Sequence, residues 1–327
     1  MHNFKEWIIY AVCFLISGVF IYFALHPSQS DQVTIDNERN IAVLLRSSTD
    51  EYWDYVRKGA DHAALEYGAS LQLHFPKDDG DVDGQVRIAQ TILESKPDAI
   101  ILGANSDAEF ADVLKEADRR HIPVIAVDSK LTSGPTTAYI GSDNERYGQE
   151  AMKEMARLLN YKGNLLIVNY VSGGINGIAR EKGANDEVIN YPDIQSVSKV
   201  ECSSDIDECK NTIMDHIERE HIDGILALMT TGSISSALAL KELDASDKIK
   251  MVGFDSSIQL LELLQEGELE SLFVQNAFSL GYLSVQYALQ AANGQSTSHS
   301  LLRDMTIVNK ENMFWLKNQK LLFPVVQ

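Results

Sequence analysis

Ile41-Ala42-Val43-Leu44-Leu45 is the stretch that decides the fold. A helical pattern follows it from Val56 onward. A continuous apolar run of this length predicts a strand buried on both faces, and the segment after it predicts a helix that ends near Tyr67. Strands that alternate with amphipathic helices predict a parallel sheet with helices on both sides. The next strand-like runs are Leu71 to Phe75, Ala99 to Leu102 and Val124 to Val127.

The same alternation starts again in the second half of the chain. A length of 327 residues exceeds what one hydrophobic core usually fills, so two α/β lobes are predicted, each a Rossmann-like parallel sheet. No Pro-rich linker separates them, which predicts a hinge of short crossovers near Ser142, Gln275 and Asp304. The second set of strands reads Leu165 to Val168, Ile225 to Met229 and Lys250 to Phe254. The predicted lobes are residues 40–142 plus 276–305, and residues 143–275 plus 306–327.

The N-terminal region predicts a single transmembrane helix. Residues 7–25 carry no charge and are long enough, as a helix, to cross most of a hydrocarbon core of ~30 Å. Lys5 precedes this segment and acidic residues follow it, which favours residues 1–6 in the cytoplasm, residues 26–39 as a tether and the rest of the chain outside. A cleavable signal peptide is the alternative, although no A-x-A-like site follows the segment.

Charge and cysteine content restrict the partners and the compartment. The formal net charge of −19 disfavours nucleic acid, because neutralising phosphates requires clustered Lys and Arg. An extracytoplasmic, oxidising location permits Cys202 and Cys209 to pair, but their spacing does not decide whether they do.

Bidentate side chains follow the predicted strands, at the edge where parallel sheets bind ligands. Carboxylates can accept hydrogen bonds from two vicinal hydroxyls of a sugar, and a guanidinium can donate to a ring oxygen and a hydroxyl. The residues in these positions predict a site for a polyhydroxylated compound. They are Arg46, Asp50, Asp128, Arg180, Asp255 and Gln275.

Several of these residues stand in motifs of a known family. From Asn40 to Lys310 the chain resembles the type 1 periplasmic sugar-binding proteins, which implies two lobes that close over a sugar. By this resemblance Asp128, Arg180 and Asp255 bind the ligand, and Gln275 lies at a crossover. The motifs are Ile122-Pro123-Val124-Ile125-Ala126-Val127-Asp128, Gly141-Ser142-Asp143-Asn144, Ala179-Arg180-Glu181-Lys182-Gly183 and Val252-Gly253-Phe254-Asp255.

Other positions refine the expected ligand. Tyr52 and Trp53 stand where the family has aromatic residues at the cleft, although helical spacing equally favours Trp53 as a core residue. Ser129 replaces an arginine usual in ribose receptors, and Arg46 could supply that guanidinium. Thr231 lies near an expected asparagine, and Ile206 lies near an expected phenylalanine.

Competing motifs are incomplete. Residues 79–84 resemble the start of a calcium loop, but Gln90 replaces its closing glutamate. Residues 172–177 form a Gly-rich turn that no Gly-Lys-Ser/Thr completes, and His216 and His221 lack the spacing of a zinc site. No metal, cofactor or enzymatic activity is predicted. Two roles remain open: a sugar receptor for an ABC permease, or an accessory receptor for a membrane sensor kinase.

Overall fold

The computed structural model describes residues 39–78, 80–170, 174–297 and 299–324. The segment predicted to cross the bilayer, residues 7–25, lies outside these residues, as do residues 1–6 and 26–38. Among the helices in the described part, none is both long and apolar enough for a membrane span. Residues 39–324 belong to one compact unit.

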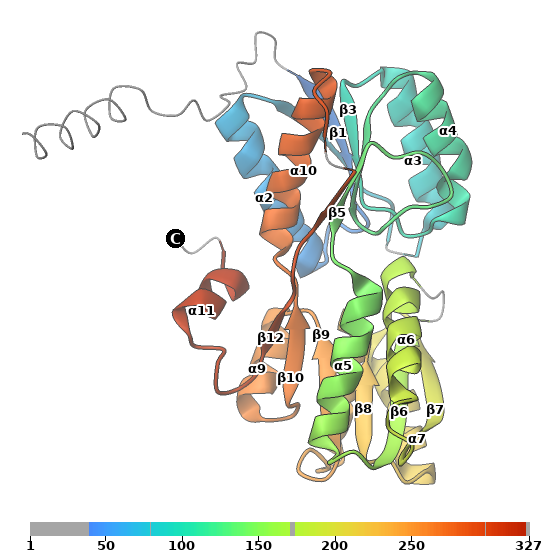
Figure 1. The fold of residues 1–327 in the computed structure, drawn as a ribbon, viewed down its shortest axis with the longest axis vertical. Coiled ribbons are helices and arrows are strands. Elements are labelled where there is room, and N and C mark those ends of the chain that lie inside the picture. Colours follow the sequence, from blue (N-terminus) through green and yellow to red (C-terminus); the bar gives the residue numbers. More distant parts are fainter. Residues whose placement is uncertain (1–38, 79, 171–173, 298, 325–327) are drawn as a thin grey trace, which may run out of the picture. The chain divides into compact units, whose positions relative to one another are not determined.

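The first lobe is a six-stranded sheet with the strand order β11-β5-β4-β3-β1-β2, and every neighbouring pair is parallel. Helices α2 and α10 cover one face, and α3 and α4 cover the other (Figure 1). The strands are β1 (Asn40–Leu44), β2 (Ser70–His74), β3 (Ala99–Leu102), β4 (Val124–Asp128), β5 (Ala138–Gly141) and β11 (Ser300–Leu302). The helices are α2 (Glu51–Tyr67), α3 (Val82–Ser95), η1 (Ala108–Phe110), α4 (Ala111–Arg119) and α10 (Ala277–Ala292).

The second lobe repeats this plan with the strand order β12-β10-β9-β8-β6-β7. Helices α5 and α6 cover one face, and α7, α8 and α9 cover the other (Figure 1). The strands are β6 (Gly163–Tyr170), β7 (Ile194–Cys202), β8 (Gly224–Ala227), β9 (Lys250–Phe254), β10 (Ser271–Val274) and β12 (Thr306–Val308). The helices are α5 (Asn144–Leu158), α6 (Ile175–Val188), α7 (Ile206–Arg219), α8 (Thr230–Glu242), α9 (Ile258–Glu266) and α11 (Leu316–Leu322).

Two parallel-sheet lobes were predicted, and the structure confirms them with one departure. Strand β12 runs antiparallel to β10. The reason lies in the last crossing, where the chain passes from β11 into β12 without a helix between them. Because β11 runs parallel to β5, toward the C-terminal edge of its sheet, the continuing chain enters the second sheet at that sheet's C-terminal edge. Strand β12 must therefore run opposite to its neighbour.

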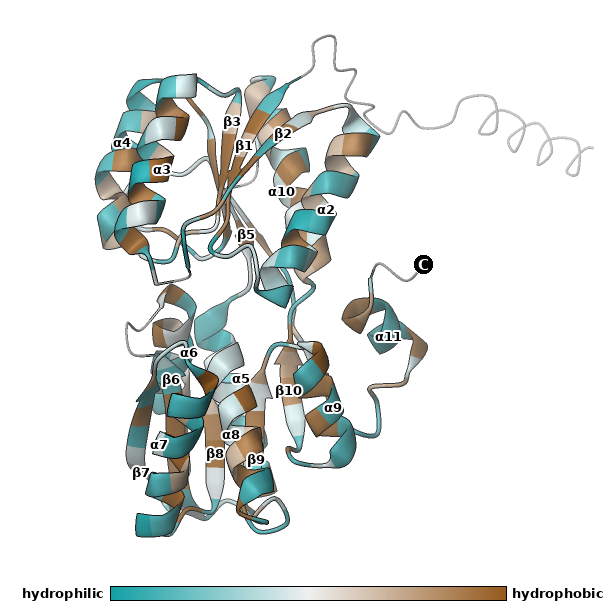
Figure 2. Cartoon of the chain, turned by 180° about the vertical axis from the view of Figure 1, so that it is seen from behind, coloured by the Kyte–Doolittle hydropathy of each residue, from teal (hydrophilic) through white to brown (hydrophobic). Residues whose placement is uncertain are grey.

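The chain crosses between the lobes three times: between β5 and α5, between β10 and α10, and between β11 and β12. Each lobe is consequently built from separate stretches of sequence. The central strands β1 and β3 are hydrophobic along their length (Figure 2), because both of their faces are covered. The edge strand β2 is only partly buried and has a mixed sequence.

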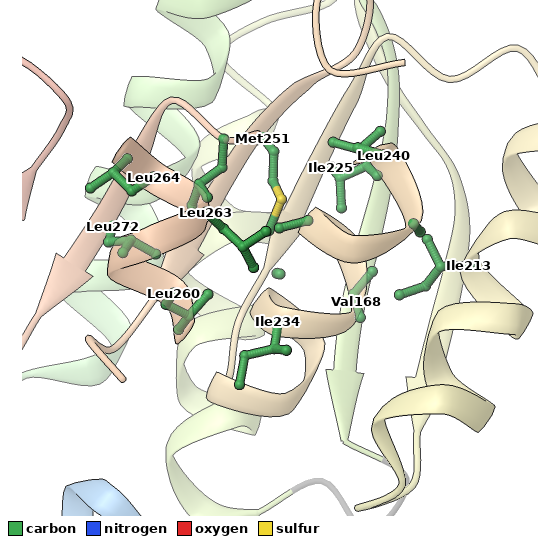
Figure 3. Packing of buried hydrophobic residues seen from close by; sticks show 14 of the residues in the cluster. Val168, Ile213, Ile225, Ile234, Leu240, Met251, Leu260, Leu263, Leu264 and Leu272 are labelled. Carbon is green, nitrogen blue, oxygen red and sulfur yellow. The ribbon is translucent and has the colours of Figure 1, made fainter. Parts of the chain in front are cut away.

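A single apolar cluster fills the space between the second sheet and helices α7 to α9 (Figure 3). Val168, Ile225, Met251 and Leu272 project from four adjacent strands, and all four side chains are fully buried. Leucines of α9 and aliphatic residues of α7 and α8 pack on them, and burying each such side chain contributes roughly 1.5–3 kcal/mol relative to exposure.

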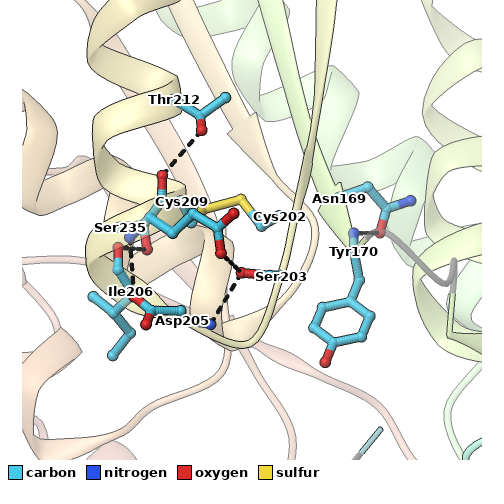
Figure 4. The surroundings of a disulfide bond; sticks show 10 residues. Asn169, Tyr170, Cys202, Ser203, Asp205, Ile206, Cys209, Thr212 and Ser235 are labelled. Atoms are coloured by element: carbon cyan, nitrogen blue, oxygen red, sulfur yellow. Dashed lines mark hydrogen bonds between the residues drawn. A yellow bond between two sulfur atoms is a disulfide. The ribbon is translucent and has the colours of Figure 1, made fainter.

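Cys202 and Cys209 form a disulfide that joins the end of β7 to the first turns of α7 (Figure 4). Their Cα atoms are 5.0 Å apart, and both side chains are buried in the cluster below α7 and α8. The hydroxyl group of Ser235 on α8 donates to the carbonyl oxygen of Ile206 at 3.0 Å. The pairing that the sequence left open is thus present in the structure, and it fixes the loop at one rim of the second lobe.

In each lobe the helix that follows a crossing packs closely on a neighbouring helix through glycines: α10 packs on α2 in the first lobe, and α5 packs on α6 in the second. A Cβ atom on Gly148 of α5 would lie 1.9 Å from the carbonyl oxygen of Arg180, and one on Gly183 would lie 1.9 Å from that of Glu145. Gly59 of α2 and Gly281 of α10 make the same close approach in the first lobe. Only glycine permits these backbones to approach so closely.

Candidate functional site

A cavity of about 390 Å³ lies where the C-terminal edges of the two sheets meet, and residues of both lobes line it. This volume is in the range of about 300–1,000 Å³ that small-molecule sites occupy. All nine residues predicted to bind the ligand line this central cavity: Arg46, Asp50, Tyr52, Trp53, Asp128, Arg180, Thr231, Asp255 and Gln275. The fold therefore brings together at this cavity residues that are far apart in sequence.

Two aspartates occupy equivalent places, one at the end of β4 and one directly after β9. Asp128 has φ +66° and Asp255 has φ +74°, both in the left-handed region that few residues other than glycine adopt. Aspartate tolerates this region better than most residues do. The backbone turn at each strand end places a carboxylate at the central cavity, and the strain of order 1–3 kcal/mol is typical of functional positions.

Asp128 accepts hydrogen bonds from both lobes. The hydroxyl group of Tyr52 donates to Oδ1 at 2.6 Å, and the amide of Asn176 donates from the second lobe to Oδ2 at 2.7 Å. Burial, followed by the neighbouring Asp128 carboxylate, raises the pKa of Tyr52 well above its ordinary value, so the phenol stays protonated and remains a donor. The backbone carbonyl of Asp128 also accepts from the hydroxyl group of Tyr139 at 3.0 Å.

Asp255 is held by hydrogen bonds within the second lobe. The hydroxyl group of Thr230 donates to its Oδ2 at 2.7 Å, and its backbone N–H donates to the carbonyl oxygen of Phe273 at 2.9 Å. Burial in the cleft raises the pKa of Asp255, although the attraction of Arg180 and the Thr230 hydrogen bond oppose that rise. Removing this carboxylate from water costs free energy. Hydroxyl groups of a ligand could offset that cost by donating to it in place of the lost water.

Arg180 on α6 is 3% exposed, and three contacts fix its guanidinium. Its Nε donates to Oδ1 of Asn144 at 2.8 Å, and its Nη1 donates to the carbonyl oxygen of Leu228 at 2.8 Å. The guanidinium carbon stacks over the Phe254 ring, 4.2 Å from the centroid. Within the described residues no acceptor bonds to Nη2, so this nitrogen is available to a ligand in the central cavity.

Gln275 lies in the second crossover and is 6% exposed. Its Oε1 atom is buried, and no group in the described part of the chain donates to it. A buried acceptor without a donor costs about 1–3 kcal/mol, which a ligand hydroxyl group or a water would offset. Gln275 therefore faces the central cavity with an acceptor to offer.

The remaining predicted residues line the central cavity as well. Asp50 is the N-cap of α2, where its Oδ1 accepts from the backbone N–H groups of Tyr52 and Trp53. Trp53 is 5% exposed and packs edge-on against Tyr52 with the ring centroids 5.3 Å apart, so it is both a core residue and part of the wall. Arg46 and Thr231 line the cavity from opposite lobes.

Sequence reasoning missed three polar residues that connect the predicted ones. Asn144 bridges Arg180 to Asn176, since its Nδ2 donates to the Asn176 Oδ1 at 3.0 Å. Together with the Asn176 bond to Asp128, this makes a continuous chain of hydrogen bonds from one lobe to the other. Thr230, next to the predicted Thr231, is the third. The sequence signals that could have indicated two of them were the Gly-rich turn, which contains Asn176, and the motif at the first crossover, which contains Asn144.

The motifs set aside on sequence grounds show no metal site in the described residues, where no group of three or more metal-ligating side chains occurs. Asp81 caps helix α3, with its Oδ1 accepting from the Gly84 N–H at 2.9 Å, while Asp79 lies outside the described residues. His216 instead lies 3.4 Å from Glu220 on the same helix.

Comparison with known proteins identifies the family. The profile of the family described as periplasmic binding protein domain matches residues 41–296. The chain belongs to this family. The sequence resemblance to type 1 periplasmic sugar-binding proteins is thereby confirmed, and membership implies an extracytoplasmic location. Because the family consists of binding proteins, the prediction that the chain is not an enzyme is also confirmed.

Relatives within the periplasmic binding proteins are distant but extensive. A xylitol-binding protein of Mycolicibacterium smegmatis is 26% identical over 249 residues, which are 75% of this chain and 70% of the relative. A D-apiose import binding protein of Paraburkholderia graminis is 26% identical over 84% of this chain and 88% of its own. A carbohydrate transporter solute binding protein of Agrobacterium radiobacter, solved with D-arabinose, superposes with a TM-score of 0.83 at 24% identity, covering 88% and 100% of the chains.

Proposed function

We propose that this protein is an extracytoplasmic receptor that binds a monosaccharide or a similar polyhydroxylated compound in the central cavity. The observation that carries the proposal is the convergence of Asp128, Arg180, Asp255 and Gln275 from two lobes, with Arg180 Nη2 and Gln275 Oε1 left for a ligand. Both acceptors and donors line the cavity. A compound whose hydroxyl groups both donate and accept matches them, as it would not match an apolar ligand.

The expected free energy of ligand binding is sufficient for a transport or sensing receptor. Charge-assisted hydrogen bonds contribute on the order of 1.5–3 kcal/mol each, so four of them, less ordering costs, support micromolar affinity near −8 kcal/mol. The named relatives bind xylitol and D-apiose or carry D-arabinose, and all three compounds are polyhydroxylated. The proposed mechanism is hinge closure, in which a ligand held by both lobes stabilises the closed state.

For the downstream role, we propose delivery of the ligand to an ABC-type importer. The support is the role of one relative, the D-apiose import binding protein. The second candidate is a receptor that signals to a membrane histidine kinase, and its support is the uncharged run at residues 7–25 with a predicted tether of residues 26–39. Such a tether spans about 20 Å as a random coil and would keep the receptor near the membrane. Co-purification from native membranes with a permease or with a kinase separates the two.

The binding proposal is tested by titration calorimetry on the full chain in mild detergent, against pentoses, hexoses, sugar alcohols, nucleosides and amino acids. We expect micromolar binding of one polyhydroxylated compound. Arg180→Lys should weaken it at least a hundredfold, because lysine lacks the planar fork that contacts the ligand, Asn144 and Leu228 together.

Matched controls come from helix α7, away from the cavity. Arg219 and Asp215 are exposed and pair with each other at 3.2 Å, so Arg219→Lys and Asp215→Asn should leave the affinity unchanged. Asp128→Asn should weaken binding by about tenfold or more. Absence of binding to every sugar and sugar alcohol by a folded sample would reject the proposal.

A further inference from the structure

A second cavity of about 260 Å³ adjoins the central cavity, beside the crossover that contains Gln275. We call it the side cavity. It shares seven lining residues with the central cavity: Thr49, Asp50, Tyr52, Thr230, Ile234, Asp255 and Gln275. Since Asp255 and Gln275 border both spaces, a ligand held by them in the central cavity has a neighbouring space available to it.

One wall of the side cavity is apolar. The C-terminal segment supplies Leu321, Leu322 and Pro324, and the start of α10 supplies Ala277 and Phe278. Leu322 is 2% exposed and belongs to the core of the second lobe, which holds this wall in place. A monosaccharide covered with hydroxyl groups gains little from such a wall, whereas an apolar substituent gains about 25 cal/mol for each Å² that it buries.

The charges of the two cavities also differ. Arg46, Lys77 and Arg180 line the central cavity, but no lysine or arginine lines the side cavity. Three carboxylates border the side cavity: those of Asp50, Glu51 and Asp255. An anionic substituent such as a phosphate would be repelled there and would find no cation to pair with.

The carboxylates at this border are already used by the protein. Oε2 of Glu51 accepts from the backbone N–H of Ile258 at 2.9 Å, Asp50 caps helix α2, and Asp255 accepts from Thr230. Beside these carboxylates, a substituent in the side cavity meets apolar side chains. Phe278 and Tyr55 add aromatic groups to the lining, which suit contact with a flat ring.

We propose that the side cavity is a subsite for an uncharged, apolar substituent attached to the sugar, so that the receptor takes a glycoside rather than a bare monosaccharide. This inference rests on the proposed function. The sugar would occupy the central cavity with Asp255 and Gln275, and its aglycone would lie against Ala277, Phe278 and Leu321.

Calorimetry on the full chain in detergent tests the subsite with defined probes. These are the free sugar, the methyl glycoside, the phenyl glycoside and the sugar phosphate of D-ribose, D-xylose, D-allose and D-galactose, with both anomers of each glycoside. For the sugar that binds, we expect one phenyl anomer to bind at least tenfold more tightly than the methyl glycoside. The phosphate should bind more weakly than the free sugar.

Two variants locate the effect in the side cavity. Ala277→Leu narrows the side cavity and Leu321→Ala removes part of its wall, so both should abolish the preference for phenyl over methyl while free-sugar affinity stays within twofold. Ala291→Leu, a partly buried position near the other end of α10, is the matched control and should retain the preference. Binding of the free sugar also shows that each variant is folded.

The possible failures are distinct. Equal affinity for methyl and phenyl glycosides, or rejection of the phenyl group by a protein that binds the free sugar, would overturn the subsite and leave the proposed function intact. A preference that survives both Ala277→Leu and Leu321→Ala would place the aglycone elsewhere and would also overturn it. Absence of binding to all sugars and glycosides would remove the proposed function itself.

Discussion

At the scale of single residues, the site combines a backbone turn with a buried charge. Asp128 and Asp255 adopt positive φ at equivalent strand ends, which aims both carboxylates at the central cavity. The raised pKa of Asp255 indicates that the ligand-free protein holds this carboxylate at a cost in stability. Stability and binding should therefore respond in opposite directions to its removal.

Asp255→Asn is expected to stabilise the ligand-free protein at pH 8 by roughly 1 kcal/mol while weakening ligand binding. A raised pKa means that the folded protein binds the proton more readily than the unfolded chain does. The stability contribution of this carboxyl group is thus complete below its unfolded pKa and is lost as the pH rises through the folded pKa. Asparagine also tolerates positive φ, so the turn should persist.

Urea unfolding at pH 5 and at pH 8 measures this effect. The gain of the variant over the natural protein should be larger at pH 8, where the aspartate is charged, than at pH 5. Asp215→Asn, at an exposed position on α7, controls for loss of one negative charge. A gain that grows toward acid pH, or a loss of stability at pH 8, would contradict the argument.

Residues at strand ends were predictable, because a parallel sheet brings its carboxyl ends together whatever its loops do. Asp128, Asp255 and Gln275 were predicted in this way and line the central cavity, whereas Arg180 lies within α6 and was predicted from a family motif. Asn176 could not be predicted, because its role depends on a side-chain contact with Asp128 across the cleft. Thr230 could not be predicted either, because the sequence does not distinguish it from the adjacent Thr231. Neither is visible in composition or periodicity.

At the scale of elements, the position of Arg180 depends on how closely two helices approach. Gly148 of α5 faces the carbonyl oxygen of Arg180 on α6, and Gly183 of α6 faces that of Glu145. The backbone of α6 is therefore set directly by contact with α5. Arg180 then reaches Asn144, at the start of the same helix α5.

Gly148→Ala should lower the free energy of unfolding by about 2 kcal/mol and weaken ligand binding at least tenfold, because the methyl group must displace the backbone at Arg180. Gly59→Ala is the matched control, since its Cβ would meet the carbonyl oxygen of Phe278 in the first lobe at the same 1.9 Å. Unfolding and calorimetry on both variants measure the difference. Equal losses of affinity would show that general loosening, rather than displacement of Arg180, is responsible.

Strands with continuous apolar sequences were found from sequence, with β3 and β9 matching the predicted bounds. The strands that were not anticipated are short or lie at an edge. Strands β11 and β12 have three residues each, and β7 is an edge strand with many polar residues and no regular alternation. Their pairing is decided by the neighbouring strand and by the crossing chain, which local sequence does not encode.

At the scale of the whole receptor, direct contacts already join the lobes without a ligand. Asn176 donates to Asp128, and the backbone of Ile258 donates to Glu51. These two hydrogen bonds bias the hinge toward closure, and each contributes about 1 kcal/mol. When such contacts increase the fraction of ligand-free protein in the closed state, they raise the apparent ligand affinity by the same factor.

Asn176→Ala should therefore open the ligand-free receptor and raise the dissociation constant of its sugar by about tenfold. Small-angle X-ray scattering of the ligand-free variant should give a larger radius of gyration than that of the natural protein, and saturating ligand should remove most of the difference. Asn190→Ala, at an exposed position beyond α6, serves as the control. An unchanged radius together with unchanged affinity would show that this contact does not bias the hinge.

The three crossings have a consequence for how the protein is made. Strand β11 pairs with β5, and α10 packs on α2, so the first lobe lacks a strand and a helix until the ribosome has passed Leu302. Pairing between such distant segments folds slowly and leaves unpaired strand edges exposed meanwhile. The N-terminal lobe cannot mature during translocation as an independent unit. A holding chaperone on the outer side of the membrane would accordingly protect the first 300 residues from aggregation until both lobes close together.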